Sequence, residues 1–206
     1  HTGWFEAVPS KELNSDDHEN GTTHWYYANS KGEITIPTAD GEVGVVKTID
    51  GKSYLFNSDG EMVTGLRILT YDGSKITNIS SEVDTADTVK NMNSDTMKLV
   101  YFESNGAAKT GTTTITLDGT SYTFSFKSNG SPRGVGETGI SDGYIYQNGL
   151  RLTADEDTKY GVVTYKNESY VVNEKGSIQK NKKNLKDADE TYYCTNAKGI
   201  LLHSST

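Results

Sequence analysis

Short runs of alternating hydrophobic and polar residues recur along the chain, and each ends in a polar turn that contains glycine. Residues 53–65, SYLFNSDGEMVTG, show the pattern most clearly. Alternation with a period of two is typical of a half-buried β-strand, and Asn, Asp, Ser and Gly are typical of tight turns. We therefore predict a short aromatic strand, a tight Asp-Gly turn and a second strand that closes at Thr-Gly.

The pattern returns at a nearly constant spacing. Aligned on the turn glycine, the copies lie at Gly32, Gly60, Gly106, Gly130, Gly176 and Gly199. Neighbouring glycines are 23, 24 or 28 residues apart, or 46, which is twice 23, and GYIYQNGLRL from Gly143 supplies the missing copy in the second long gap. Such a period indicates a repeat array. The predicted fold is all-β: an elongated β-hairpin solenoid with roughly 20–28 residues per repeat and one irregular insertion.

Strand alternation sorts the side chains of each copy onto two faces. One face is bulky in nearly every copy and is the predicted continuous core: Tyr26, Ala28, Tyr54, Phe56, Val100, Phe102, Phe124, Phe126, Tyr170, Val172, Tyr193 and Thr195. The other face varies and is predicted to be free for function: Trp25, Tyr27, Ser53, Leu55, Leu99, Tyr101, Thr123, Ser125, Ser169, Val171, Tyr192 and Cys194. An isolated hairpin is marginal in water, so the units must share their buried faces with neighbours.

Three zones follow from the repeat. Residues 1–65 hold N-terminal repeats, 66–98 are irregular or a degenerate repeat, and 99–206 hold C-terminal repeats. In the middle zone SSEVDTADTVKNM carries a capping box at Ser81 and Asp84 and helical spacing of Val83, Ala86 and Val89, so a short helix and a degenerate hairpin both stay open. Residues 9–21 are predicted to form a polar loop with one helical turn.

The chain opens on the Thr-Gly that closes a repeat, at Thr2, and we expect it to be part of a longer protein. Its formal net charge of −8 argues against nucleic acid as a partner and equally against simple electrostatic adhesion to polyanionic wall polymers or anionic lipid. A single cysteine, Cys194, excludes an intrachain disulfide and a cysteine metal cluster. No apolar run approaches the length of a membrane span.

Two stretches, GWF…HWYYANSKGEI and GKSYLFNSDGEMVTGL, resemble the cell-wall-binding repeats, also called choline-binding repeats, of Gram-positive surface proteins. The resemblance covers essentially the whole chain, most weakly around residues 66–98. It implies a β-hairpin solenoid, an extracellular location at the cell wall or surface or as a secreted protein, and attachment to wall polymers. Family members with choline sites build aromatic cages, and related repeats in glucan-binding and toxin proteins bind carbohydrate.

The resemblance also places the candidate ligand site. Trp4 fills the tryptophan position of the GW motif, and Trp25 with Tyr27 fills the WYY motif. Other copies depart from both motifs: Leu66, Thr112 and Ile140 follow the other Thr-Gly pairs, and Ser53, Leu99, Thr123 and Ser169 replace the WYY tryptophan. Two interpretations stay open for the three aromatic residues, a ligand site and simple packing at the end of the array.

Other residues give little sign of chemistry. Asp16, His18 and Asn20 precede Gly21 as in the first half of a calcium loop, but Tyr27 stands where the twelfth-position carboxylate is needed. We therefore expect no metal and no cofactor. We also expect no catalytic residues, because no serine pairs with a histidine and an oxyanion loop. Lysines in KGSIQKNKKNLK, residues 175–186, could contact teichoic acid or form a solvated loop.

The sequence therefore predicts a non-enzymatic module that holds a surface protein on cell-wall polymer, teichoic acid or glycan, with weak choline-type recognition by aromatic side chains. The alternative is a structural spacer, or a protein-binding adhesin array without a small-molecule site.

Overall fold

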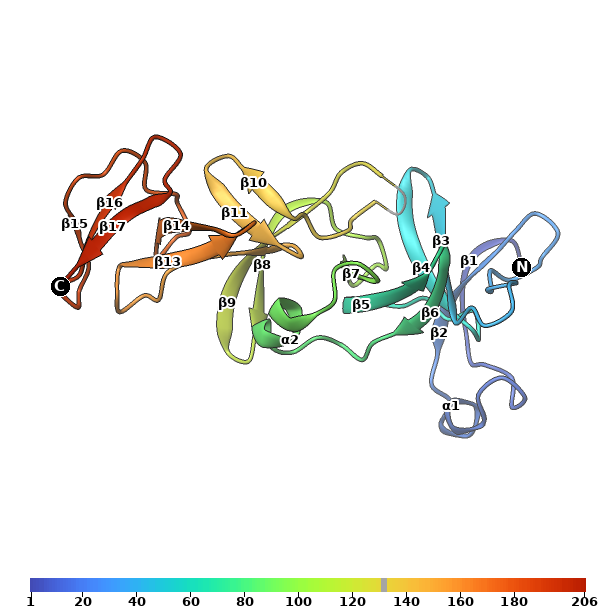
Figure 1. Cartoon of the computed structure of the whole chain (residues 1–206). Helices are drawn as coiled ribbons and strands as arrows, with labels where there is room; N and C mark the ends of the chain where they lie inside the picture. Colours follow the sequence, from blue (N-terminus) through green and yellow to red (C-terminus); the bar gives the residue numbers. More distant parts are fainter. Residues whose placement is uncertain (131–132) are drawn as a thin grey trace.

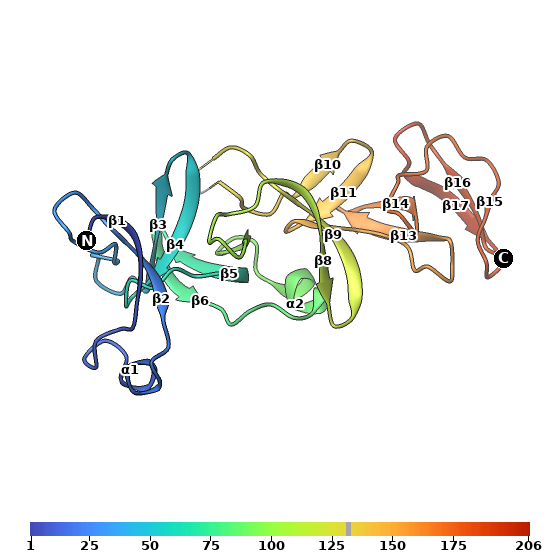
Figure 2. The ribbon, with the colours of Figure 1, turned by 180° about the vertical axis from the view of Figure 1, so that it is seen from behind.

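A computed structural model describes residues 1–130 and 133–206. The chain forms an elongated row of small antiparallel sheets, with the N-terminus at one end and the C-terminus at the other (Figure 1). The same serial order is visible from behind (Figure 2). The predicted all-β hairpin repeat fold is confirmed.

Five sheets follow one another along the row. The first pairs β1 (Gly3–Ala7) with β2 (His24–Ala28), and α1 (Ser15–Asn20) lies in the loop between them. The second has the strand order β4-β3-β6-β5-β7, made of β3 (Gly44–Ile49), β4 (Lys52–Asn57), β5 (Gly65–Asp72), β6 (Lys75–Ile79) and β7 (Met97–Phe102).

The third sheet has the order β10-β11-β12-β9-β8, made of β8 (Gly111–Leu117), β9 (Thr120–Phe126), β10 (Gly139–Ser141), β11 (Tyr144–Gln147) and β12 (Leu150–Arg151). The last two sheets are β13 (Tyr160–Tyr165) with β14 (Glu168–Asn173), and β15 (Leu185–Lys186) with β16 (Tyr192–Thr195) and β17 (Leu201–Ser205). A second short helix, α2 (Ala86–Asn91), packs between the second and third sheets.

An asparagine builds the glycine turn in the repeats that turn at Gly32, Gly60, Gly176 and Gly199. In the second unit the Gly60 N–H donates to the Asn57 carbonyl at 3.0 Å, and the Asn57 side-chain oxygen accepts from the backbone N–H groups of Asp59 and Glu61. Gly60 has a φ of +80°, which glycine adopts without a steric cost. The same side-chain contacts form at Asn29, Asn173 and Asn196.

The structure corrects the predicted strand order within a repeat. The aromatic strand β4 pairs along its whole length with β3, which precedes it, through a turn at Asp50 and Gly51. After the Gly60 turn only Met62 bridges back, to Phe56. Asp50 and Gly51 both have positive φ, the two-residue turn whose twist matches that of an antiparallel pair. The Thr-Gly pair at residues 64–65 leads into the first strand of the next unit.

The predicted core face is confirmed. Of its twelve residues all are buried except Tyr54, which is half-buried. In the described residues the buried side chains of both faces form three hydrophobic clusters in series along the row. The first is centred on Leu55 and Phe102, the second on Phe124 and Leu99, and the third on Val172.

The prediction that the second face is free for function is wrong in the middle of the array. Ser53, Leu55 and Leu99 are buried there, and so are Ser125 and Val171. Leu55 packs on Leu69 and Ile76, residues of the additional strands β5 and β6. Two broad sheets therefore bury both faces of their aromatic strands.

Residues 66–98 contain both structures that the sequence left open, the hairpin β5–β6 and the helix α2. Val83, Ala86 and Val89 are buried as their spacing predicts. The predicted capping box is wrong, because the side chain of Thr85 caps the helix by accepting from the Thr88 N–H.

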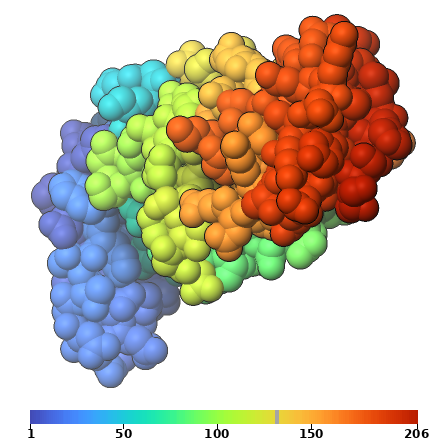
Figure 3. All heavy atoms as spheres, turned by 90° about the vertical axis from the view of Figure 1, so that its left-hand side faces the viewer, coloured from blue at the N-terminus to red at the C-terminus, as the bar shows by residue number. Residues whose placement is uncertain are grey.

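The loop between β1 and β2 contains the predicted helical turn. Asn14 caps the N-terminus of α1, and its side chain accepts from the Asp17 N–H. Gly21 ends the helix with a φ of +67°. None of the α1 residues is buried. The loop projects from the array as a separate lobe (Figure 3). In the described residues no helix is both long and apolar enough to cross a membrane.

Candidate functional site

The first hairpin places Trp4 directly opposite Tyr27. Their Cα atoms are register partners, and their rings meet edge to face with centroids 5.2 Å apart. Trp25 lies on the same face of β2, because strand residues two apart point the same way. Its cross-strand partner is Glu6. The candidate residues therefore share one face of the sheet.

Trp4 also joins the first hairpin to the second. Its ring lies 4.8 Å from that of Tyr54 and 5.8 Å from that of Phe56, both on β4. The aromatic face, defined as Trp4, Trp25, Tyr27 and Tyr54, is therefore contributed by two units. Sequence reasoning assigned Tyr54 to the core and missed this role. In the structure Tyr54 differs from the other predicted core residues because it is half-buried and they are buried.

Trp25 is the most open member of the aromatic face. It is 45% exposed, and among the described residues no other ring pairs with it. The structure thus brings Trp4 and Tyr27 into contact and leaves Trp25 beside them as a free indole. A flat, exposed aromatic ring is suited to stacking on a sugar or to attracting a cation.

The chain's own Lys47 already lies near this face. Its Nζ is 5.6 Å from the centre of the Tyr27 ring, within the range of a cation–π contact. The same arrangement recurs further along the array, where Arg151 lies over Tyr144 at 3.7 Å. Further pairs join Arg151 to Tyr146, Lys159 to Tyr160, Lys166 to Tyr165, and Lys186 to Tyr192. Internal cations therefore cover several tyrosines that an external cation could otherwise contact.

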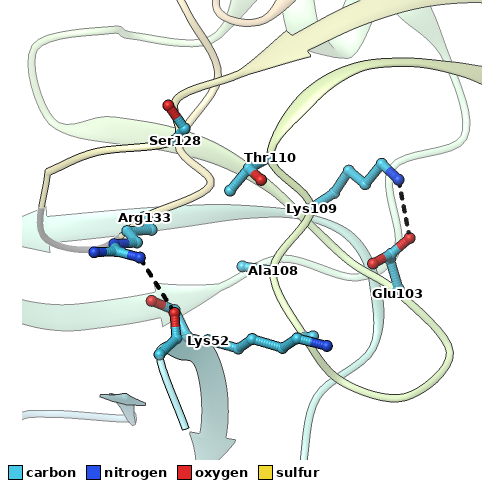
Figure 4. A pocket seen from close by; sticks show the side chains of 10 residues that line it. Lys52, Glu103, Ala108, Lys109, Thr110, Ser128 and Arg133 are labelled. Atoms are coloured by element: carbon cyan, nitrogen blue, oxygen red, sulfur yellow. Dashed lines mark hydrogen bonds and ion pairs between the residues drawn. The ribbon is translucent and has the colours of Figure 1, made fainter. Parts of the chain in front are cut away.

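A second candidate site, a concave one of about 340 Å³, lies between the β3–β4 turn and the loop after β9 (Figure 4). It has three cationic side chains, Lys52, Lys109 and Arg133. Lys109 pairs with Glu103 at 3.2 Å, and Arg133 donates to the Gly51 carbonyl. Among the described ion pairs none involves Lys52, so its charge is available to an anion.

The basic run at residues 175–186 lies along the connection from β14 to β15. Its lysines are exposed, and Lys186 pairs with Glu190 at 2.8 Å. The Cys194 thiol donates to the Lys183 carbonyl. This geometry is that of a solvated loop, and its contact with teichoic acid stays a prediction.

Comparisons with protein-family models and with curated proteins gave no match. Solved structures do match. Choline-binding protein F in complex with ipratropium is 20% identical, with a TM-score of 0.55 over 98% of this chain and 49% of that one. A second crystal form of choline-binding protein F, from Streptococcus pneumoniae, is 20% identical, with a TM-score of 0.53 over 98% of this chain and 48% of that one.

The resemblance to choline-binding repeats predicted from the sequence is therefore confirmed as a resemblance of fold. The chain spans about half the length of these solved structures.

Proposed function

We propose that the chain is a non-catalytic extracellular module that holds a surface protein on cell-wall polymer. The observation that supports this most directly is the aromatic face, with an exposed Trp25 beside the packed Trp4–Tyr27 pair. Choline-binding protein F, which shares the fold, lends the proposal its ligand class. The ligand is either choline on teichoic acid or a sugar of the wall glycan.

Magnitudes require weak binding at a single face. A cation over one aromatic ring gains about 0.5–1 kcal/mol when exposed and ~2 kcal/mol when desolvated. One such face gives affinity in the roughly millimolar range. A wall polymer presents many copies of its unit, so repeated weak contacts can still retain a surface protein through multivalency. Lys52, in the second candidate site, is placed to contact the phosphates of such a polymer.

The proposal is tested by passing the chain over choline resin and over purified wall polysaccharide, and by calorimetry with choline at millimolar concentration. Retention on one matrix identifies the ligand class. Passage through both, with no heat of binding, would remove the support for anchoring.

Trp25→Ala separates binding from packing. Because about half of this large side chain is buried, we expect the free energy of unfolding to fall by about 1–2 kcal/mol. Polymer binding should fall about three- to tenfold, the value of one cation–π or stacking contact. Val162→Ala, which removes a similarly exposed residue from β13, is the matched control and should leave binding unchanged. Unchanged binding together with lost stability in Trp25→Ala would mean that Trp25 only packs.

Lys47→Gln tests the internal cation. Without the Lys47 ammonium, choline no longer has to compete for the Tyr27 ring. The affinity for choline should therefore rise about two- to fivefold. Lys52→Gln removes the same charge from the neighbouring strand without touching Tyr27 and should not raise choline affinity. Calorimetry of the two variants provides the comparison. Equal affinities would show that Tyr27 takes no part in binding.

A second function is favoured by the internal cations themselves. If Lys47 and Arg151 permanently occupy the rings of Tyr27 and Tyr144, the array is a structural spacer or a protein-binding adhesin without a small-molecule site. Binding to neither matrix, combined with unchanged choline affinity in Lys47→Gln, would favour this function.

A further inference from the structure

Three side chains with metal-ligand chemistry converge beside the first hairpin. Asp17 comes from α1, His24 begins β2, and Glu61 lies in the turn after β4. The His24 Nε2 atom is 2.9 Å from Asp17 Oδ2 and 3.7 Å from Glu61 Oε1, and all three ligand atoms lie within 4.8 Å of one another. His24 lies on the face of β2 opposite to Trp25, so this cluster is separate from the aromatic face.

Glu61 supplies the independent sign of a missing partner. The residue is only 8% exposed, and its Oε2 accepts from the Asn57 side chain at 2.9 Å. Its other oxygen, Oε1, is buried and has no hydrogen-bond partner in the described residues, although it points at His24. A buried carboxylate oxygen without a partner is costly, so an occupant that satisfies it would be stabilising.

The surroundings of the cluster are negative. Asp59 lies in the same turn as Glu61 and adds a third carboxylate. The Tyr26 hydroxyl is also buried without a partner in the described residues. In the part of the chain that the structure describes, no lysine or arginine forms an ion pair with these carboxylates.

The nearest arginine does not neutralise the cluster. Arg67 lines the same open pocket of about 510 Å³ as His24 and Glu61. Its guanidinium donates instead to the carbonyls of Thr64, at 2.7 Å, and Ser80, at 3.2 Å. In the described residues only His24 therefore faces the Glu61 carboxylate within ion-pair distance.

We propose that Asp17, His24 and Glu61 bind a zinc ion. Zinc takes histidine nitrogen and carboxylate oxygen at about 2.0–2.2 Å, which puts the ligand atoms of a tetrahedral site about 3.4 Å apart. The two separations from His24, 2.9 and 3.7 Å, lie on either side of that value, and the two carboxylate oxygens lie within 4.8 Å of each other, so side-chain rotations would complete the site. The nitrogen ligand favours zinc over calcium or magnesium, which prefer oxygen throughout. The open pocket gives the ion an entry path and room for water as the fourth ligand.

Such an ion would fasten the projecting lobe to the array. No residue of α1 is buried, so the helix itself has no hydrophobic anchor and relies on polar contacts. The three ligands come from α1, from β2 and from the second unit. Zinc would therefore join the lobe to two segments that already contact each other, since the Met62 N–H donates to the Trp25 carbonyl at 2.8 Å.

Zinc titration of the chelator-treated 206-residue chain tests the site. By calorimetry we expect saturable binding of one ion per chain. His24→Ala and Glu61→Gln should each lower the affinity roughly tenfold or more. Zinc should also slow tryptic cleavage at Lys11, at the base of the lobe, in the wild type and not in His24→Ala.

His18→Ala is the matched control, because His18 lies in the same lobe, contacts the Pro9 carbonyl and is not part of the cluster. It should bind zinc as the wild type does. Absence of saturable binding by the wild type would overturn the proposal and leave His24 as the partner of both carboxylates without an ion. Wild-type affinity in both His24→Ala and Glu61→Gln would also overturn it, because the ion would then bind outside the cluster.

Discussion

Phe124→Ala is expected to lower the free energy of unfolding by about 3–5 kcal/mol, the usual effect of truncating a fully buried phenylalanine. Phe124 has no exposed surface, and its ring stacks on that of Phe126 with centroids 6.1 Å apart. It packs in one cluster with Leu66 and Leu99 of the second sheet and Leu150 of the third. The cavity would therefore open where the two broad sheets meet.

Chemical denaturation followed by tyrosine and tryptophan fluorescence measures the effect. Ile140→Ala, at a position 47% exposed on β10, should change the stability by less than about 1 kcal/mol. A loss for Phe124→Ala no larger than that of Ile140→Ala would contradict the shared cluster.

Gly136→Ala is expected to destabilise the chain by about 3 kcal/mol, because an added methyl group would meet backbone rather than a side chain that could move. A Cβ atom at Gly136 would lie 2.6 Å from the Asn148 carbonyl oxygen and 2.9 Å from the Gly149 nitrogen. The Gly136 N–H meanwhile donates to the Leu99 carbonyl at 2.8 Å, so the segment is held on both sides. Relief would require breaking the contact between the second and third sheets.

Gly119→Ala is the matched control for Gly136→Ala. Gly119 has a φ of +76° and open space where its Cβ would be, so alanine should cost only about 1–2 kcal/mol of backbone strain. Thermal unfolding followed by circular dichroism should therefore give a lower melting temperature for Gly136→Ala than for Gly119→Ala. The reverse order would show that the backbone at Asn148 can move away from a methyl group at position 136.

Much of the fold follows from local pattern. Alternation along each aromatic strand was enough to identify the buried positions, because a strand packed on its neighbours must bury one whole face. The second face could not be predicted in the same way. Leu55 is buried by residues of β5, β6 and β7, and Leu99 by residues of β5, α2 and β9, so both positions depend on contacts far along the chain.

The site shows the same division. Trp4 and Tyr27 meet because they are cross-strand partners in one hairpin, which sequence motifs can indicate. Tyr54 joins them from the next unit, and its contact depends on how hairpins stack. The cluster of Asp17, His24 and Glu61 could not be predicted from the sequence. Its spacings of 7 and 37 residues match no metal motif. The calcium-like half loop drew attention to Asp16 and His18 instead, which are exposed in the structure.

Trp4 bridges the end unit to its neighbour, and this has a thermodynamic consequence for any polymer seated on the proposed site. The ring that would contact the ligand is also a ring that holds the first hairpin against Tyr54 and Phe56. Occupancy would oppose fraying of the terminal sheet, because a ligand that binds only the assembled form adds to its stability by mass action. Attachment to the wall and cohesion of that end of the molecule would then rise and fall together.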